Sequence, residues 1–326
     1  MNHLRRSPFS SFSLLPLALS ALALAILATG CKKPQRAAPV RRAPAPTVSA
    51  QQLMEKGENQ LNRGKWDDGR ETLKLIEEYM PGSVFFPRAK LLIADSLFYS
   101  RKNNFPLAEV EYQSLLNYFP RHEQKDYVLY RIALCRFVQI EDSQRDQSAT
   151  HKAIEAFNRL LTESPGTPYA TDAKAKINTC WARLAEHELG VAIFYVNTSQ
   201  FRAAETRLKN MLEAYPEFSD RERAYYYLGE ALRRRYPTRD DFTQEFQSFL
   251  GSIGKTDEDP LTSAERRQWD LRRDFFTKDQ TDKFTAEARA YYLRLVESYP
   301  NSTWAGLARD RLLALGQTRI TEELDG

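Results

Sequence analysis

The 326-residue chain is poor in the residue types that build catalytic and metal sites, with three cysteines, four histidines and thirteen glycines. Beyond the N-terminal segment the histidines are scattered at His122, His151 and His187, and neither an H-E-x-x-H pattern nor a C-x-x-C pair occurs. The chain also lacks a glycine-rich phosphate loop and a G-x-S-x-G motif. These absences argue against metalloenzymes, nucleotide-binding enzymes and serine hydrolases. We therefore predict a protein that is not an enzyme and that binds no cofactor or metal.

Acidic residues are missing from the first 42 positions, so the net charge of +4 describes the body of the chain poorly. This stretch holds seven basic residues, Arg5, Arg6, Lys32, Lys33, Arg36, Arg41 and Arg42. The remainder has 40 basic and 43 acidic residues, a net charge of −3. A body of that charge has no electrostatic attraction to phosphates, and we predict no nucleic-acid partner.

Long apolar runs are also scarce, and the one that occurs ends in a cysteine, at "AILATGCKKPQR" (residues 25–36). A basic start at Arg5 and Arg6, an apolar middle and a small-residue end are typical of a secretory signal peptide. Residues 27–31, Leu-Ala-Thr-Gly-Cys, resemble a bacterial lipobox, which implies cleavage before Cys31 and acylation of its thiol. The alternative is an uncleaved anchor helix, because about 22 uncharged residues are long enough to span a bilayer.

Lipidation would place the protein on a membrane. Two or three acyl chains on Cys31 hold a protein firmly in lipid, since each buried CH₂ contributes roughly 0.8 kcal/mol. By resemblance to the lipoprotein sorting rule, Lys32 favours the outer membrane, with the protein facing the periplasm. We assign residues 1–30 to the signal peptide and residues 31–49 to the lipidated cysteine and a tether, which four prolines keep extended. In an oxidising periplasm Cys135 and Cys180 are either buried thiols or a disulfide.

From residue 50 onward, prolines recur behind one helical pattern. The residues five, eight and twelve positions before each proline are Ile76, Leu73 and Gly69 before Pro81; Leu115, Tyr112 and Ala108 before Pro120; Leu160, Phe157 and Ala153 before Pro165; Met211, Leu208 and Ala204 before Pro216; and Leu295, Tyr292 and Ala288 before Pro300. Offsets of three and four place the large residues on one helical face, and the small residue marks the close approach of a partner helix. The proline ends the helix. The pattern resembles the second helix of a tetratricopeptide repeat.

This resemblance predicts an all-α fold, a superhelix of about five tetratricopeptide-like helix pairs with a C-terminal capping helix. The array is expected over residues 50–316, with a tail at 317–326. The proline spacing is irregular, and its largest gap indicates an insertion in the fifth repeat at residues 237–283. Such arrays form a concave groove for extended peptides or partner helices, so the fold favours binding over catalysis.

Two stretches are more specific than a generic repeat. "FPRHEQKDYVLY" (Phe119–Tyr130) resembles the P-x-H-x-x-x-D-Y-x-x-Y segment of the BamD family, a lipoprotein subunit of the outer-membrane β-barrel assembly machine. The stretch from "SQRDQSATHKAIEAF" to "FRAAETRLKNMLEAYP" resembles the same family in order and spacing, so that the resemblance covers residues 50–236. The long insertion and the proline- and arginine-rich tether depart from the family pattern.

The resemblance implies a periplasmic scaffold with three kinds of protein partner: the periplasmic domain of the barrel-forming insertase, other lipoproteins of the machine, and outer-membrane protein precursors through their C-terminal strands. It places Arg207 where the insertase docks. Arg207 lies between Ala204 and Leu208, at the edge of the buried face, where its guanidinium can reach a partner carboxylate. A pair with a neighbouring repeat of the same chain is the alternative. Tyr99 and Tyr127 are the other predicted partner-binding residues.

A different tetratricopeptide lipoprotein is the alternative function. A secretin pilotin, or a regulator of cell division or of peptidoglycan enzymes, would share the lipobox and the repeat array. Neither class explains the Phe119–Tyr130 segment, and for this reason the assembly scaffold is our preferred prediction.

Overall fold

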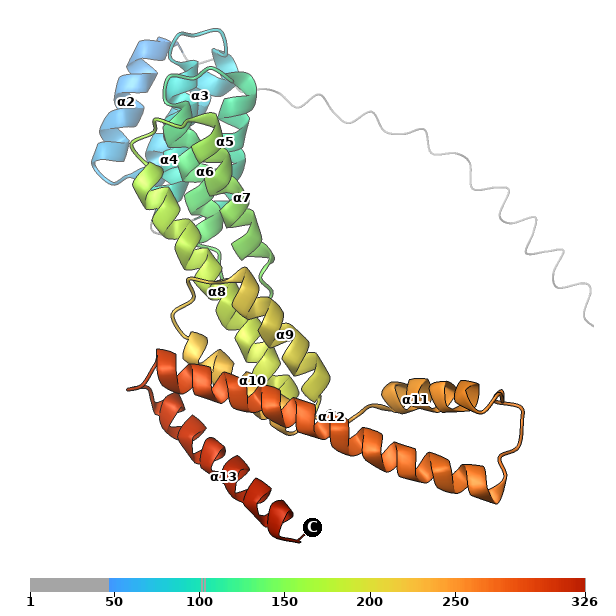
Figure 1. Cartoon of the computed structure of the whole chain (residues 1–326). Helices are drawn as coiled ribbons and strands as arrows, with labels where there is room; N and C mark the ends of the chain where they lie inside the picture. Colours follow the sequence, from blue (N-terminus) through green and yellow to red (C-terminus); the bar gives the residue numbers. More distant parts are fainter. Residues whose placement is uncertain (1–46, 101, 103, 326) are drawn as a thin grey trace, which may run out of the picture. The chain divides into compact units, whose positions relative to one another are not determined.

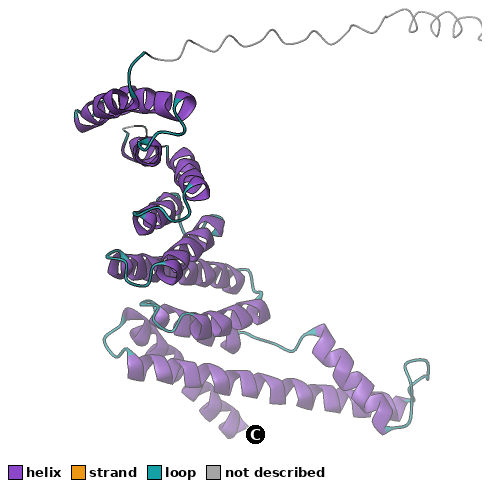
Figure 2. Ribbon diagram, turned by 90° about the horizontal axis from the view of Figure 1, so that it is seen from above, coloured by secondary structure: helices purple, strands orange, loops and turns teal. Residues whose placement is uncertain are grey.

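A computed structural model describes residues 47–325 except residues 101 and 103, with side chains up to residue 316. In this part of the chain all twelve elements are α-helices (Figure 2). Ten of them form pairs: α2 (Ala50–Asn62) with α3 (Trp66–Tyr79), α4 (Phe86–Tyr99) with α5 (Phe105–Tyr118), α6 (Lys125–Phe137) with α7 (Ser148–Glu163), α8 (Ala170–Asn197) with α9 (Phe201–Ala214), and α10 (Arg221–Arg233) with α12 (Ser263–Ser298). The predicted all-α fold of stacked helix pairs is confirmed.

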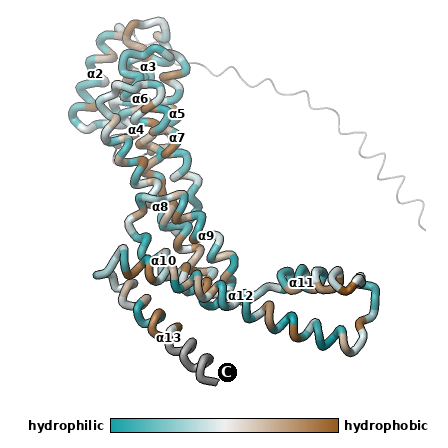
Figure 3. The backbone as a smooth tube through the Cα atoms, in the orientation of Figure 1, coloured by the Kyte–Doolittle hydropathy of each residue, from teal (hydrophilic) through white to brown (hydrophobic). Residues whose placement is uncertain are grey.

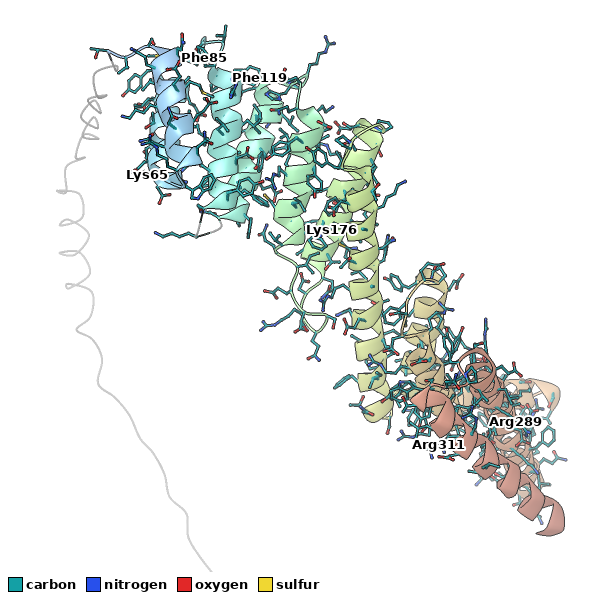
Figure 4. All side chains as sticks on the ribbon, turned by 90° about the vertical axis from the view of Figure 1, so that its left-hand side faces the viewer. Lys65, Phe85, Phe119, Lys176, Arg289 and Arg311 are labelled. Carbon is teal, nitrogen blue, oxygen red and sulfur yellow. The ribbon has the colours of Figure 1, made fainter. Side chains whose placement is uncertain are left out.

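Consecutive helices pack against one another along the array (Figure 1). The short turns make neighbours antiparallel: Figure 4 places Phe85 and Phe119, which flank α4 and α5, at one end of the helices and Lys65, before α3, at the other. Hydrophilic and hydrophobic residues alternate along the coloured helices (Figure 3). Most of the helices are amphipathic, and their apolar faces are buried against neighbouring helices.

The proline register agrees with the observed packing. All fifteen residues that the sequence pattern singled out are buried, and each proline stands two residues beyond the last residue of its helix. The small positions are sites of close approach, as expected. A Cβ atom added to Gly69 would lie 2.5 Å from a methyl group of Leu61 on the facing helix.

Enlarging a small position of this register is expected to destabilise the array. Ala204 is fully buried in a cluster with Val196 and Ala231, so Ala204→Leu should lower the free energy of unfolding by about 2 kcal/mol through overpacking. The neighbouring Ala203 is exposed, and Ala203→Leu is the matched control with an effect within about 0.5 kcal/mol. Urea unfolding followed by circular dichroism measures both, and equal midpoints would contradict the repeat register.

The stretch predicted as an insertion contains α11 (Arg239–Ser252) and the first part of α12, which lie side by side as a helical hairpin (Figure 1). Thr238 and Thr262 begin the two helices with capping boxes, in which the hydroxyl and a carboxylate three residues later satisfy free backbone N–H groups. Phe246 meets Trp269 edge-on at 4.8 Å, and Arg272 pairs with Glu245 at 2.6 Å. No proline or glycine interrupts α12, so one helix of 36 residues serves both the hairpin and the fifth repeat.

The C-terminal helix differs from our prediction in length. α13 (Thr303–Asp325) packs on α12 and α10 through Ala305 and Ala308, as expected of a capping helix. It continues to Asp325, through the residues that we assigned to a tail at 317–326. The reason is local: after Gly316 the sequence "QTRITEELD" contains no proline or glycine that would end the helix.

Two further findings concern the cysteines and the membrane. Cys135 and Cys180 are free thiols buried in different clusters of the core. No helix in the described part of the chain is both long enough and apolar enough to cross a bilayer. Cys31 and the signal peptide lie outside the described residues.

Candidate partner-binding site

A groove of about 1040 Å³ lies between α8, α9 and the residues that follow α10, and we call it the α8–α10 groove. Its lining contains four arginines and one glutamate, together with three aromatic rings. The charged and aromatic lining residues are Glu188, Tyr195, Phe201, Arg202, Arg207, Arg234, Arg235 and Tyr236. The groove is therefore positively charged, whereas the body of the chain carries a net negative charge.

The turn between α8 and α9 shapes one end of this groove. Ser199 lines it with a φ of 62°, in the left-handed region that non-glycine residues seldom adopt. The backbone N–H of the next residue, Gln200, donates to the carbonyl of Tyr195 and closes the turn at 2.8 Å. This turn holds α9 antiparallel to α8.

Arg207 forms an ion pair inside the groove. One guanidinium nitrogen donates to Glu188 on α8 at 2.5 Å, and the guanidinium carbon lies 5.7 Å from the ring centre of Tyr195. The side chains of Arg207 and Glu188 are 32% and 31% exposed, so the pair stays accessible to a partner. The intramolecular pair that we gave as the alternative is thus present, at the predicted edge of the buried face.

The other three arginines differ in how far their charge is neutralised. Arg235 pairs with Glu205, a nearly buried carboxylate that also accepts from Lys209. Arg234 stacks over the ring of Phe201 at 4.6 Å. Neither Arg202 nor Arg234 forms a salt bridge with another residue in the described part of the chain. Two guanidiniums are therefore available to an acidic partner without breaking an internal pair.

A second groove, of about 1130 Å³, lies at the end of α4 where α5 turns into α6, and we call it the α4–α6 groove. Seven of its lining residues belong to the Phe119–Tyr130 segment, and α4 contributes Leu91, Leu92 and Asp95. Phe119 is anchored by an edge-on contact with Phe86 at 5.5 Å. The segment that carries the family resemblance therefore forms one wall of a groove.

Asp95 is the centre of a partly buried polar cluster that borders the α4–α6 groove. Its carboxylate accepts hydrogen bonds from the hydroxyls of Tyr112 and Tyr127 at 2.5 and 2.9 Å. Arg131 donates to the Tyr127 hydroxyl at 2.8 Å. Burial raises the pKa of Asp95, although both tyrosine hydrogen bonds and the charge of Arg131 favour its ionised form.

Arg131 brings two predicted residues together. Its guanidinium lies 4.4 Å from the ring centre of Tyr99 and 5.0 Å from that of Tyr127, and it also stacks on Phe98. Tyr99 is 49% exposed and has Trp66 stacked beside it, whereas the Tyr127 hydroxyl is engaged internally. Arg207 lines the α8–α10 groove and Tyr127 lines the α4–α6 groove, whereas Tyr99 lines neither of them. Sequence reasoning missed Asp95, Arg131 and Arg234; only the four-residue spacing from Tyr127 to Arg131 could have indicated a contact.

Comparison with known families supports the sequence resemblance. The model of the YfiO family, described as an outer membrane lipoprotein, matches residues 46–245, which include both grooves. The chain belongs to this family of outer membrane lipoproteins. A tetratricopeptide repeat model also matches residues 285–302, which comprise the last part of α12 and the turn after it.

Curated relatives of this YfiO-family chain carry the name outer membrane protein assembly factor BamD. The relative from Caulobacter vibrioides is 30% identical over 179 residues, which are 55% of this chain and 58% of that protein. The Vibrio cholerae relative is 28% identical and the match covers 53% of this chain and 75% of the relative. The Haemophilus influenzae relative is 27% identical, and the match covers 66% of this chain and 83% of the relative.

Because the chain belongs to a lipoprotein family, we expect acylation at Cys31, and a substitution there tests this expectation. Cys31→Ala removes the only thiol of the lipobox-like segment, so the variant should remain as precursor or appear as soluble protein. Intact-mass measurement of the membrane-extracted wild type should show loss of residues 1–30 and addition of acyl mass. A Cys31→Ala variant that is still processed and anchored would rule out the lipobox prediction.

Proposed function

We propose that this lipoprotein is an assembly factor for outer membrane proteins and works as a periplasmic scaffold, not as an enzyme. The observation that carries the proposal is the family match over residues 46–245, because it includes both grooves and the segment of specific resemblance. The names of the curated relatives support the same function.

The insertase is proposed to dock in the α8–α10 groove. The groove is accessible and carries four arginines, two of them without a salt bridge in the described chain. A partner domain that presents carboxylates would be held there by charge-assisted, bidentate hydrogen bonds, and aromatic rings beside the arginines would cover its apolar surface.

Precursor proteins are proposed to bind through their C-terminal strands in the α4–α6 groove. Leu91 and Leu92 give the groove an apolar wall, and Arg121 at its rim forms no salt bridge with another described residue. A strand that ends in an apolar residue and a free carboxylate matches both features. Tyr127 lines this groove and is proposed to contact the strand. Tyr99 lies outside the lining, stacked on Trp66 and Arg131, and is proposed as a separate partner contact.

Affinity capture distinguishes the proposed function from its alternative. Protein extracted from outer membranes in mild detergent should recover the barrel-forming insertase and the other lipoproteins of the machine. Recovery of a secretin, or of a peptidoglycan enzyme without the insertase, would replace the proposal with the pilotin or the regulator. A wall-hydrolysis assay with the purified protein should show no activity.

A further inference from the structure

A third hollow, separate from both grooves, lies where the middle of α8 faces the turn between α9 and α10, and we call it the α8–turn pocket. It has a volume of about 520 Å³. Its aromatic and polar lining consists of Asn178, Trp181, Tyr215, Glu217 and Phe218. Neither the insertase nor the precursor proposal uses any of these residues.

The pocket has a splayed aromatic wall. The rings of Trp181 and Tyr215 lie 6.0 Å apart at 50° to one another, and Trp181 is 42% exposed. Tyr215 and Phe218 pack against the core cluster around α10. Core packing therefore holds the Tyr215 side of the pocket in place, while one face of the Trp181 ring stays open to solvent.

The same wall carries hydrogen-bond donors without a partner. Within the described part of the chain, the Asn178 amide, the Trp181 indole N–H and the Tyr215 hydroxyl form no hydrogen bond. The Tyr215 hydroxyl is protonated at neutral pH, as for any tyrosine, and burial raises its pKa further. Asn178 and Trp181 are exposed, so their donors are free to meet an acceptor on a bound partner.

These features select an extended peptide as the occupant. A bound helix would use its carbonyls internally, and a bound β-strand needs a sheet edge, which the described helices do not offer. A polyproline II segment has no internal hydrogen bonds, so it presents carbonyls to outside donors and pyrrolidine rings to aromatic wedges.

The negative charge of the pocket favours a peptide that carries basic residues beside its prolines. Glu217 is exposed, forms no salt bridge with another described residue, and is the one charged group in the lining. We propose that the α8–turn pocket binds an extended, proline-rich, basic segment of another protein. Prolines stack between Trp181 and Tyr215, carbonyls accept from the three donors, and an arginine or lysine of the segment pairs with Glu217.

A peptide titration tests this proposal. The probe is a fluorescein-labelled peptide of sequence APPRPAPPRPAP, titrated into the full mature lipoprotein in nanodiscs and followed by anisotropy. Saturable binding is expected, with a loss of at least about tenfold in affinity for Trp181→Ala and for Glu217→Lys. Replacing the prolines of the probe with alanine should cost a similar factor. Glu213→Lys, an exposed change outside the pocket on α9, is the matched control and should bind as the wild type.

Three results would overturn the proposal: no saturable binding to the wild type, equal binding to Trp181→Ala, or tighter binding of the alanine-substituted, helix-forming probe. Circular dichroism melts check that the variants fold. If Trp181→Ala unfolds, Glu217→Lys and Trp181→Phe decide, since the latter keeps a ring but loses the indole donor. Arg207 lies in a different groove, so insertase capture and peptide binding can fail independently.

Discussion

Arg207→Glu is expected to abolish co-purification of the lipoprotein with the barrel-forming insertase while its helical melt stays near that of the wild type. Loss of a charge contact in a docked interface costs about 2–5 kcal/mol, much of it from the partner's unpaired carboxylate. The fold should tolerate the change because the pair with Glu188 is about one third exposed, and such pairs contribute only about 0–1 kcal/mol. Affinity capture and a circular dichroism melt measure the two effects separately.

The internal partner of Arg207 provides the decisive control. In the variant, the introduced carboxylate would repel Glu188, so the loss could come from a distorted groove instead of a missing contact. The double variant Arg207→Glu, Glu188→Arg restores the internal pair with its charges exchanged. If Arg207 contacts the insertase, this double variant should still fail to bind, whereas a basic residue in place of the insertase's acidic one should restore binding.

Two outcomes would remove this contact from the proposed function. Normal capture of the insertase by Arg207→Glu would show that the guanidinium takes no part in docking. Unfolding of the variant, or recovery of binding in the double variant with Glu188→Arg, would show that Arg207 serves the packing of α8 on α9. Arg183→Glu, which breaks an exposed pair elsewhere on α8, should leave capture unchanged.

Gly229→Ala is expected to destabilise the C-terminal repeats strongly. A Cβ atom at Gly229 on α10 would lie 2.4 Å from a ring carbon of Tyr292 on α12. That ring is fully buried, and its hydroxyl is held by Glu230 at 2.7 Å, so it cannot move aside. Overpacking against a rigid ring should cost about 3 kcal/mol, which exceeds the helix-propensity gain of about 1 kcal/mol from replacing glycine.

A second helical glycine provides a control in which substitution by alanine should raise the stability instead of lowering it. Nothing lies within 4 Å of a Cβ atom added to the exposed Gly190 on α8, so Gly190→Ala should stabilise by about 0.5–1 kcal/mol. Urea unfolding followed by circular dichroism compares the two midpoints with the wild type. A Gly229→Ala protein as stable as the wild type would mean that α10 and α12 pack less closely than the structure has them.

The repeat architecture could be read from the sequence because its determinants are local. Positions such as Leu208 and Ala204 repeat at fixed distances before a proline, and helical geometry alone places them on one face. The apolar face must be buried, and the proline must end the helix, whatever the partner helix is. The compartment was equally local, since the lipobox-like segment ending at Cys31 needs no fold to be recognised.

Tertiary structure alone decided which side chains meet across repeats. Arg207 and Glu188 are 19 residues apart, and Tyr127 and Asp95 are 32 apart, on helices whose relative rotation no periodic pattern specifies. The same holds for Arg131 between Tyr99 and Tyr127, and for Trp181 facing Tyr215. Periodicity determines which face of a helix is buried, but the sliding and rotation of one helix against the next depend on side-chain packing over the whole interface. The grooves and the ion pairs inside them therefore depend on tertiary packing and cannot be derived from the periodic pattern.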